Sequence, residues 1–279
     1  MSDPAGHPPQ TLAIDIGGTG LKASVLDDWG KMVEKHVRVP TPYPCSPAIL
    51  VEALVKLTAP LASYDRISIG FPGVVRDGRI ITAPHFKGKT WVNYPLVDTL
   101  ARRLGKPARL LNDAEVQGLG IIKGQGLEVV LTLGTGVGSA IFSNGALTPH
   151  LELAQHPIHK DETYNEYVGN AARQALSSRK WNKRVLNVIG HVYSLVHYDV
   201  LYLGGGNAAR VTGALPDNIH VASNDAGITG GIRLWDDTVW SDVLGRRAVL
   251  AAGLSAAASP KLTAPGAGGC AQSDAAYQK

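Results

Sequence analysis

The sequence has 279 residues, of which 44% are hydrophobic and 18% charged, and its formal net charge is +4. This composition is ordinary for a globular protein with enough apolar residues for a core, and the length suits one large domain or two lobes. There is no run of about 18 apolar residues, so we expect no membrane span. The modest charge gives no reason to expect a nucleic-acid partner.

Residues 1–10 are polar and lack the apolar centre of a signal peptide, so we expect a disordered N-terminus. The two cysteines, Cys45 and Cys270, lie far apart and have no metal-ligand spacing. A reduced protein in the cytoplasm is the simplest interpretation.

Strands and helices are expected to alternate along the first half of the chain. Apolar runs predict strands over 11–16, 21–26, 31–39, 66–70 and 108–111. Apolar residues at helical spacing predict helices over 49–57 and 96–104. A stretch rich in hairpin signals lies between them and extends to Trp91.

The second half begins with the same pattern. Strands are expected over 129–133, 139–142, 146–148 and 200–203, and helices near 162–176, 180–196 and 241–256. A unit of strand, glycine loop and two strands therefore occurs twice. We expect an N-terminal lobe over 11–120, a C-terminal lobe over 121–256 whose last helix can pack back on the first lobe, and a disordered tail over 257–279. Ligands favour the cleft between two such lobes.

The first glycine loop contains Gly17, Gly18 and Thr19, with Asp15 before it and Lys22 after it. Glycines let backbone amides approach phosphate oxygens, and Thr19 adds a hydroxyl donor. A carboxylate such as Asp15 suits a Mg²⁺ ion that keeps its water ligands. The alternative is a structural hairpin turn.

The second loop, with Gly134, Thr135 and Gly136, has the same chemistry at the matching place. Its glycine spacing and the strand that follows it disfavour a dinucleotide-binding fold. Two glycine hairpins that face each other suggest two phosphate clamps.

A third glycine run, Gly204, Gly205 and Gly206, follows a strand and permits close approach of a flat ligand, or is simply a flexible turn. Asn112 and Asp113 follow another strand. Asp113 can accept the proton of a sugar hydroxyl that attacks phosphorus, and Asn112 can bind a neighbouring hydroxyl. Either residue can also cap a helix, which is compatible with the first role.

A polar cluster of Glu152, Gln155 and His156 follows the second hairpin and offers the mixed donors and acceptors that sugar hydroxyls need. The cluster means little by itself, because a single histidine is more often structural.

Taken together and in this order, the motifs resemble the ROK family of sugar kinases and transcriptional repressors, above all its polyphosphate glucokinase branch. The similarity extends from about Leu12 to Trp235 and includes Gly-Phe-Pro-Gly at 70–73. The resemblance implies an α/β actin-like ATPase (ribonuclease H-like) fold with two lobes and a central cleft. It implies phosphoryl transfer from polyphosphate or ATP to the 6-hydroxyl of glucose or a related hexose.

The resemblance also implies roles for single residues. Asp113 matches the catalytic base, Asn112 and Glu152 match residues that hold the sugar, Asp15 matches a carboxylate linked to Mg²⁺ through water, and Gly73 helps to shape the sugar pocket. The first two glycine loops match the phosphate clamps, and the third glycine run belongs to the nucleotide side.

The sequence departs from the family at two places. Gln155 stands where the kinases carry a histidine that contacts the sugar, and His156 follows one residue later. The cysteine-rich zinc motif is absent, so we expect no zinc. The repressors carry a helix-turn-helix domain, whereas only residues 1–10 precede the first strand here, so we expect no nucleic-acid binding. By analogy with the family we expect a homodimer.

Two questions stay open from the sequence. A basic stretch around Trp181 could guide polyphosphate into the cleft or could be the solvated face of a helix; it contains Arg173, Arg179, Lys180, Lys183 and Arg184. The other question is activity: the alternatives to a kinase are a regulatory protein that binds sugar or nucleotide without catalysis, and a hydrolase such as an exopolyphosphatase.

Overall fold

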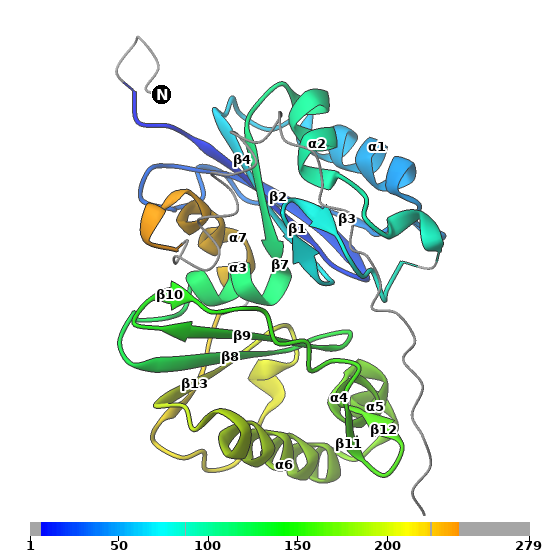
Figure 1. Ribbon diagram of the computed structural model, residues 1–279, viewed down its shortest axis with the longest axis vertical. Helices are drawn as coiled ribbons and strands as arrows, with labels where there is room; N and C mark the ends of the chain where they lie inside the picture. Colours follow the sequence, from blue (N-terminus) through cyan, green and yellow to red (C-terminus); the bar gives the residue numbers. More distant parts are fainter. Residues whose placement is uncertain (1–6, 87, 224, 240–279) are drawn as a thin grey trace, which may run out of the picture.

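Two five-stranded sheets form the framework of the protein (Figure 1). The computed structural model describes residues 7–86, 88–223 and 225–239. The first sheet has the order β3-β2-β1-β4-β7. Its strands are β1 (Thr11–Ile16), β2 (Gly20–Leu26), β3 (Val37–Pro40), β4 (Arg66–Phe71) and β7 (Ala108–Asn112).

The second sheet repeats this topology in the order β10-β9-β8-β13-β14. Its strands are β8 (Leu127–Leu133), β9 (Val137–Ser143), β10 (Ala146–Leu147), β13 (Val200–Gly204) and β14 (Ile219–Val221). In each sheet the first strand of the unit pairs antiparallel with the second and parallel with a later strand. The repeated unit expected from the sequence is therefore present.

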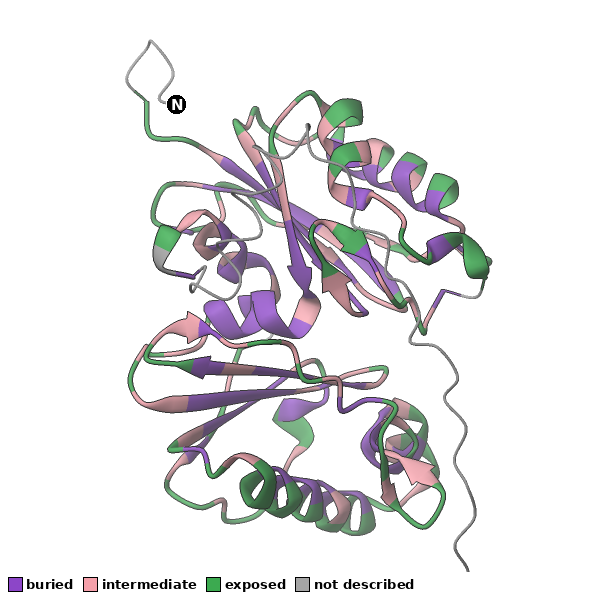
Figure 2. Cartoon of the chain, viewed as in Figure 1, coloured by how far each residue is buried: buried purple, intermediate pink, exposed green. Residues whose placement is uncertain are grey.

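Helices cover the outer face of each sheet. On the first sheet they are α1 (Pro47–Thr58) and α2 (Leu96–Leu104), and on the second α4 (Tyr164–Val168), α5 (Asn170–Ala175) and α6 (Ser178–Val196). The Ser46 hydroxyl caps α1 by accepting from Ile49 N, and Gly105 ends α2 in the left-handed conformation. The outward side of α6 is exposed, whereas Trp181 and Val185 are buried beneath it (Figure 2).

Helix α3 (Asp113–Leu119) lies between the two sheets and is buried along almost its whole length (Figures 1 and 2). Val116 and Leu119 pack with Val130 and Phe142 of the second sheet. At Gly118 an added Cβ would come within 2.5 Å of the Phe142 ring, so only glycine allows this approach. Because α3 is packed between the two sheets, its first residue, Asp113, has a fixed position relative to both lobes.

After β14 the chain returns to the first lobe. Helix α7 (Ala226–Thr229) and the 3₁₀ segments η3 (Gly230–Trp235) and η4 (Asp237–Val239) make up this returning segment, and α7 and η3 contact β1 and α3. Ser68 Oγ donates to the Gly231 carbonyl (2.6 Å) and accepts from Trp235 Nε1 (2.9 Å). The guanidinium of Arg109 lies 4.5 Å from the centre of the Trp235 ring.

Short elements complete the described chain. They are β5 (Val75–Arg76), β6 (Arg79–Ile80), η1 (Lys89–Trp91), β11 (Pro157–His159), β12 (Glu162–Thr163) and η2 (Ala208–Arg210). Across the ranges that the structure describes, no helix combines the length and the apolar character needed to cross a membrane.

Several expectations need correction or lie outside the described ranges. The predicted strand over 31–39 is wrong in its first half, because Met32 forms only an isolated bridge with Leu26, residues 33–34 bend, and strand β3 begins at Val37. The helical stretch over 162–176 is broken at Gly169. The helix over 241–256, the tail over 257–279 and residues 1–6 lie outside the described ranges. The division into lobes at residue 120 remains a proposal.

Candidate active site

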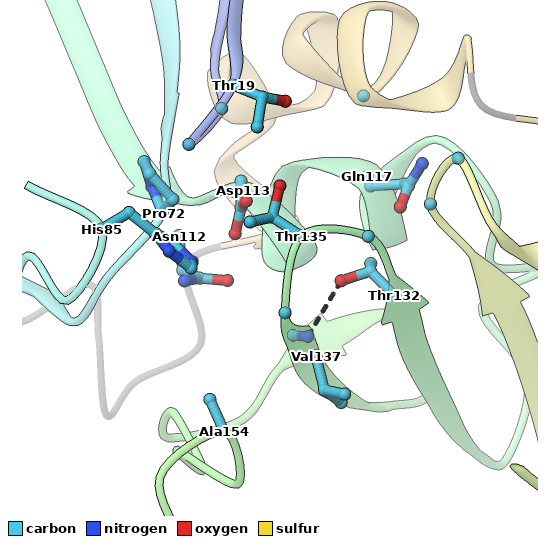
Figure 3. A pocket seen from close by; sticks show the side chains of 18 of the residues that line it. Thr19, Pro72, His85, Asn112, Asp113, Gln117, Thr132, Thr135, Val137 and Ala154 are labelled. Carbon is cyan, nitrogen blue, oxygen red and sulfur yellow. Dashed lines mark hydrogen bonds between the residues drawn. The ribbon is translucent and has the colours of Figure 1, made fainter. Parts of the chain in front are cut away.

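A cleft of about 440 Å³ opens between the two sheets where their central strands end (Figure 3). It lies beyond the carboxyl ends of β1, β4, β7, β8 and β13. Loops at such strand ends are the usual ligand sites of α/β proteins.

Most of the predicted site residues line this cleft. They are Asp15, Gly17, Gly18, Thr19, Lys22, Gly73, Asn112, Asp113, Gly134, Thr135, Gly136, Glu152, Gly205 and Gly206. The other three predicted residues do not line it. Gln155 and His156 are exposed, and Gly204 is buried beside the Gln117 side chain.

The first glycine loop joins β1 and β2. Gly17 N donates to the Gly20 carbonyl (2.9 Å), and Thr41 Oγ1 donates to the Gly17 carbonyl (2.7 Å). A Cβ at Gly17 would lie only 2.9 Å from the Gly20 oxygen, so this turn requires glycine. The loop is thus fixed from its own lobe, with the Thr19 side chain directed into the cleft (Figure 3).

The second glycine loop joins β8 and β9 in the opposite lobe. Asparagine side chains support it: Asn165 Oδ1 accepts from Val137 N (2.7 Å), and Asn207 Nδ2 donates to the Gly134 carbonyl (3.2 Å). Thr135 and Thr19 come from the two lobes and flank one space, beside which Asp113 lies (Figure 3). The two loops are therefore rigid and opposed.

Asp113 begins α3, and Asn112 is the N-cap of that helix. Asn112 Oδ1 accepts from Ala114 N (2.8 Å), while its Nδ2 donates to the Gly73 carbonyl (3.1 Å). Glu115 Oε2 accepts from Asn112 N (3.0 Å) and completes a capping box. The capping role is therefore confirmed for Asn112, and contact with a sugar stays a prediction.

The carboxyl of Asp113 lies in an unusual electrostatic environment. Burial raises its pKa most, and the nearby charges of Asp15, Glu152 and Glu115 raise it further, against a hydrogen bond from Ala114 N, so that the pKa is about 8. A pKa displaced towards neutrality is typical of groups that take part in proton transfer.

Cations balance these carboxylates at both ends of the cleft. Lys22 Nζ lies 3.1 Å from Asp15 Oδ2, and Arg38 also lines the cleft. His150 lies between two carboxylates: its Nδ1 is 2.8 Å from Glu115 Oε1, and its Nε2 is 3.5 Å from Glu152 Oε2. Burial disfavours the charged ring, but the two carboxylates outweigh it and raise the pKa of His150 to about 9.

The sequence did not point to several residues of this site. His85 lines the cleft beside Gly18, and burial lowers the pKa of its ring. Glu115 and His150 are 35 positions apart in the chain, so no local motif connects them. Asn207 directly follows the third glycine run, so its position in the sequence could have indicated a role in the site.

The predicted basic stretch divides into several environments. Lys180, Lys183 and Arg184 line a separate groove on α6 together with His159. Trp181 is buried, and its Nε1 donates to the Val168 carbonyl (2.9 Å).

The model of the ROK family matches residues 11–150 of this chain, half of its length. The chain belongs to the ROK family. The polyphosphate glucokinase of Mycobacterium tuberculosis (strain ATCC 25177 / H37Ra) is 28% identical over 214 residues, which cover 74% of this chain and 80% of that protein. The N-acetylmannosamine kinase of Escherichia fergusonii is 37% identical over 145 residues, 49% of this chain and 48% of that protein.

Solved structures agree with this assignment. The inorganic polyphosphate/ATP-glucomannokinase from Arthrobacter sp. strain KM superposes with a TM-score of 0.74 and 30% identity, over 80% of this chain and 97% of that chain. A ROK family glucokinase from Streptomyces griseus, in complex with glucose and AMPPNP, gives a TM-score of 0.69 at 21% identity, over 81% and 98%. The predicted family and the actin-like ATPase fold are confirmed.

Proposed function

We propose that this protein is a hexose kinase that transfers a phosphoryl group from polyphosphate or ATP to the 6-hydroxyl of glucose or a related hexose. The observation that carries the proposal is the position of the Asp113 carboxyl, in a cleft between two opposed glycine hairpins. Such hairpins supply amide donors for a phosphate chain from both sides. The names of the relatives support a sugar kinase.

On the acceptor side, Asp113 orients the sugar 6-hydroxyl and accepts its proton as oxygen attacks phosphorus. A pKa of about 8 makes the carboxylate a stronger base than an ordinary aspartate at neutral pH. Glu152 accepts hydrogen bonds from other hydroxyls of the hexose. His85 and Gly73 border the same part of the cleft and restrict the orientation of the sugar.

On the donor side, the backbone amides of both glycine loops and the hydroxyls of Thr19 and Thr135 surround the phosphoryl group. Lys22 and Arg38 supply positive charge at the cleft wall. Fixed donors of this kind stabilise the charge that develops on the transferring group without reorganising during the reaction.

The donor set also fits Mg²⁺. This ion usually keeps several waters and takes one or two carboxylates together with substrate phosphates. Asp15, a partly exposed carboxylate next to the first glycine loop, would hold it, and the bound ion would neutralise charge on the donor.

The groove on α6 supports polyphosphate as one donor. Three cationic side chains, Lys180, Lys183 and Arg184, gather there with His159, and a polyanion is the ligand that matches this charge. Arg184 also binds Glu162 (3.0 Å), so the two lysines contribute most of the unbalanced charge. ATP remains the second donor, because both glycine loops are intact.

A coupled assay tests the proposal: purified protein, glucose, Mg²⁺ and either ATP or polyphosphate, with glucose 6-phosphate read through its dehydrogenase. We expect product in the wild type and almost none in Asp113→Asn. A double Lys180→Ala, Lys183→Ala variant should raise the KM for long polyphosphate several-fold and leave the KM for ATP unchanged. Lys56→Ala, on the other lobe, is the matched control for loss of lysine charge.

A regulatory protein without catalysis is the second candidate, and the observation that favours it is the exposure of Gln155 outside the cleft. It predicts hexose or nucleotide binding with no product from either donor across several hexoses. We further propose that the protein is cytoplasmic and that it forms a homodimer, and sedimentation of the purified protein would test the dimer.

A further inference from the structure

A continuous chain of polar groups crosses from the catalytic helix to the proposed sugar ligand. Asn112 N donates to Glu115 Oε2 (3.0 Å), and Glu115 Oε1 contacts His150 Nδ1 (2.8 Å). His150 Nε2 faces Glu152 Oε2 (3.5 Å), and Glu152 Oε1 accepts from Ala154 N (2.9 Å). The helix that carries Asp113 is therefore tied through one imidazole to the segment that carries Glu152.

The His150–Glu115 contact within this chain is well shielded from water, whereas the Glu152 side chain is 32% exposed. The side chains of His150 and Glu115 are 14% and 7% exposed. Both oxygens of Glu115 are engaged, one by the helix cap and one by the ring, so its carboxylate cannot turn away from His150. A ring with a carboxylate at each nitrogen donates from both N–H groups only when it is doubly protonated.

A cation is needed between Glu115 and Glu152 because several carboxyl groups lie close together in this cleft. The carboxyl groups of Asp15, Glu115 and Glu152 lie near that of Asp113, and their charges raise the pKa of Asp113. His150 is the cationic group that contacts two of them directly. Without it, Glu152 would keep only the Ala154 amide and would be repelled by its neighbours.

We propose that His150 is a positioning residue for the acceptor sugar, which fixes the Glu152 carboxylate at a set distance from Asp113. The inference rests on the proposed function, since it assigns Glu152 to hexose hydroxyls. It also places an imidazole beside Glu152 that comes from a different position than the sequence suggested: His150 lines the cleft, whereas Gln155 and His156 do not.

The expected effect is on sugar binding rather than on chemistry. Replacing a charge-assisted hydrogen bond with a neutral one in His150→Gln should raise the KM for glucose about 10- to 100-fold. We expect kcat to change less than about threefold, and the KM for the donor not at all, because Asp113 and both glycine loops stay in place. His191→Gln, on the exposed side of α6, is the matched control.

A double-mutant cycle separates this role from general destabilisation. If His150 acts through Glu152, the double variant His150→Gln, Glu152→Gln should bind glucose no more weakly than Glu152→Gln alone. Additive losses would overturn the proposal, and so would unchanged glucose affinity in His150→Gln. Calorimetric titration with glucose, without a phosphoryl donor, measures the glucose affinity of all four proteins in this cycle independently of turnover.

The wild-type protein supplies a test that does not depend on a folded variant. In ¹⁵N-histidine NMR spectra at pH 7.5, we expect one ring with both nitrogens protonated and a midpoint at about pH 9, assigned to His150. Titration of that ring near the ordinary value of 6.5 would overturn the ion pair. Absence of any hexose binding by the wild type, with the ring protonated as expected, would instead overturn the proposed function.

Discussion

Asp113→Asn should slow the reaction and stabilise the protein at the same time. The amide has the shape of the carboxyl group, and its Oδ1 can still accept from Ala114 N, as the carboxylate does at 2.9 Å. Loss of a general base lowers rates about 10²- to 10⁴-fold. At 1.36 kcal/mol for each tenfold change, the activation barrier rises by about 3–5 kcal/mol.

The stability gain follows from the raised pKa of Asp113, which changes from 3.8 to about 8 on folding. The unfolded chain ionises this group above pH 3.8, while the folded protein keeps it protonated up to about pH 8. The carboxyl therefore costs stability that grows with pH across this window, by at most 1.36 kcal/mol per unit. Because the cleft admits some solvent, we expect the variant's advantage in unfolding free energy to grow by roughly 0.5–1 kcal/mol per pH unit.

Urea unfolding of both proteins at pH 5, 6, 7 and 8, without Mg²⁺ or sugar, measures this advantage. Asp28→Asn, at an exposed position, is the control and should show no such trend. An advantage that is absent, or equal at all four pH values, would refute the electrostatic reasoning. Full activity in Asp113→Asn would refute the assignment of the base.

Three further predictions follow from the geometry. Because Asp113 must be ionised to accept a proton, kcat/KM should rise up to about tenfold per pH unit as the pH approaches 8, and a flat pH–rate profile would contradict its role. Gly17→Ala places a Cβ 2.9 Å from the Gly20 oxygen, so the donor KM should rise about tenfold or more while calorimetry finds unchanged glucose affinity. Ser68→Ala removes two hydrogen bonds to the returning segment and should lower the unfolding free energy in urea by about 1–3 kcal/mol, whereas exposed Ser63→Ala should not.

The sequence predicted most of the strands of the two sheets because each contains an apolar run, and several of these runs end at a glycine. The helix expected over 96–104 forms over those residues. The sequence offered Asn112 or Asp113 as a helix cap but gave no bounds for α3, since all residues from Ala114 to Leu119 are buried and no polar face marks the helical period. The short strand β14 was missed as well, because only Ile219 of its three residues is buried.

The site was predictable where a motif is local and not where the fold brings distant residues together. Both glycine loops, Asp15 and Asp113 line the cleft as expected. The contact of His150 with Glu115 depends on how α3 packs against the second sheet, which no spacing along the chain encodes.

The most direct test of the central claim is the ³¹P NMR spectrum of a reaction of the wild-type protein with Mg²⁺, glucose and ATP or polyphosphate. A kinase with Asp113 at the sugar 6-hydroxyl predicts a resonance coupled to the two protons on C6 of glucose, and little orthophosphate. Orthophosphate that accumulates at the same rate without glucose would contradict the account and indicate a hydrolase. An unchanged donor spectrum with both donors and several hexoses would contradict it in favour of a regulatory protein.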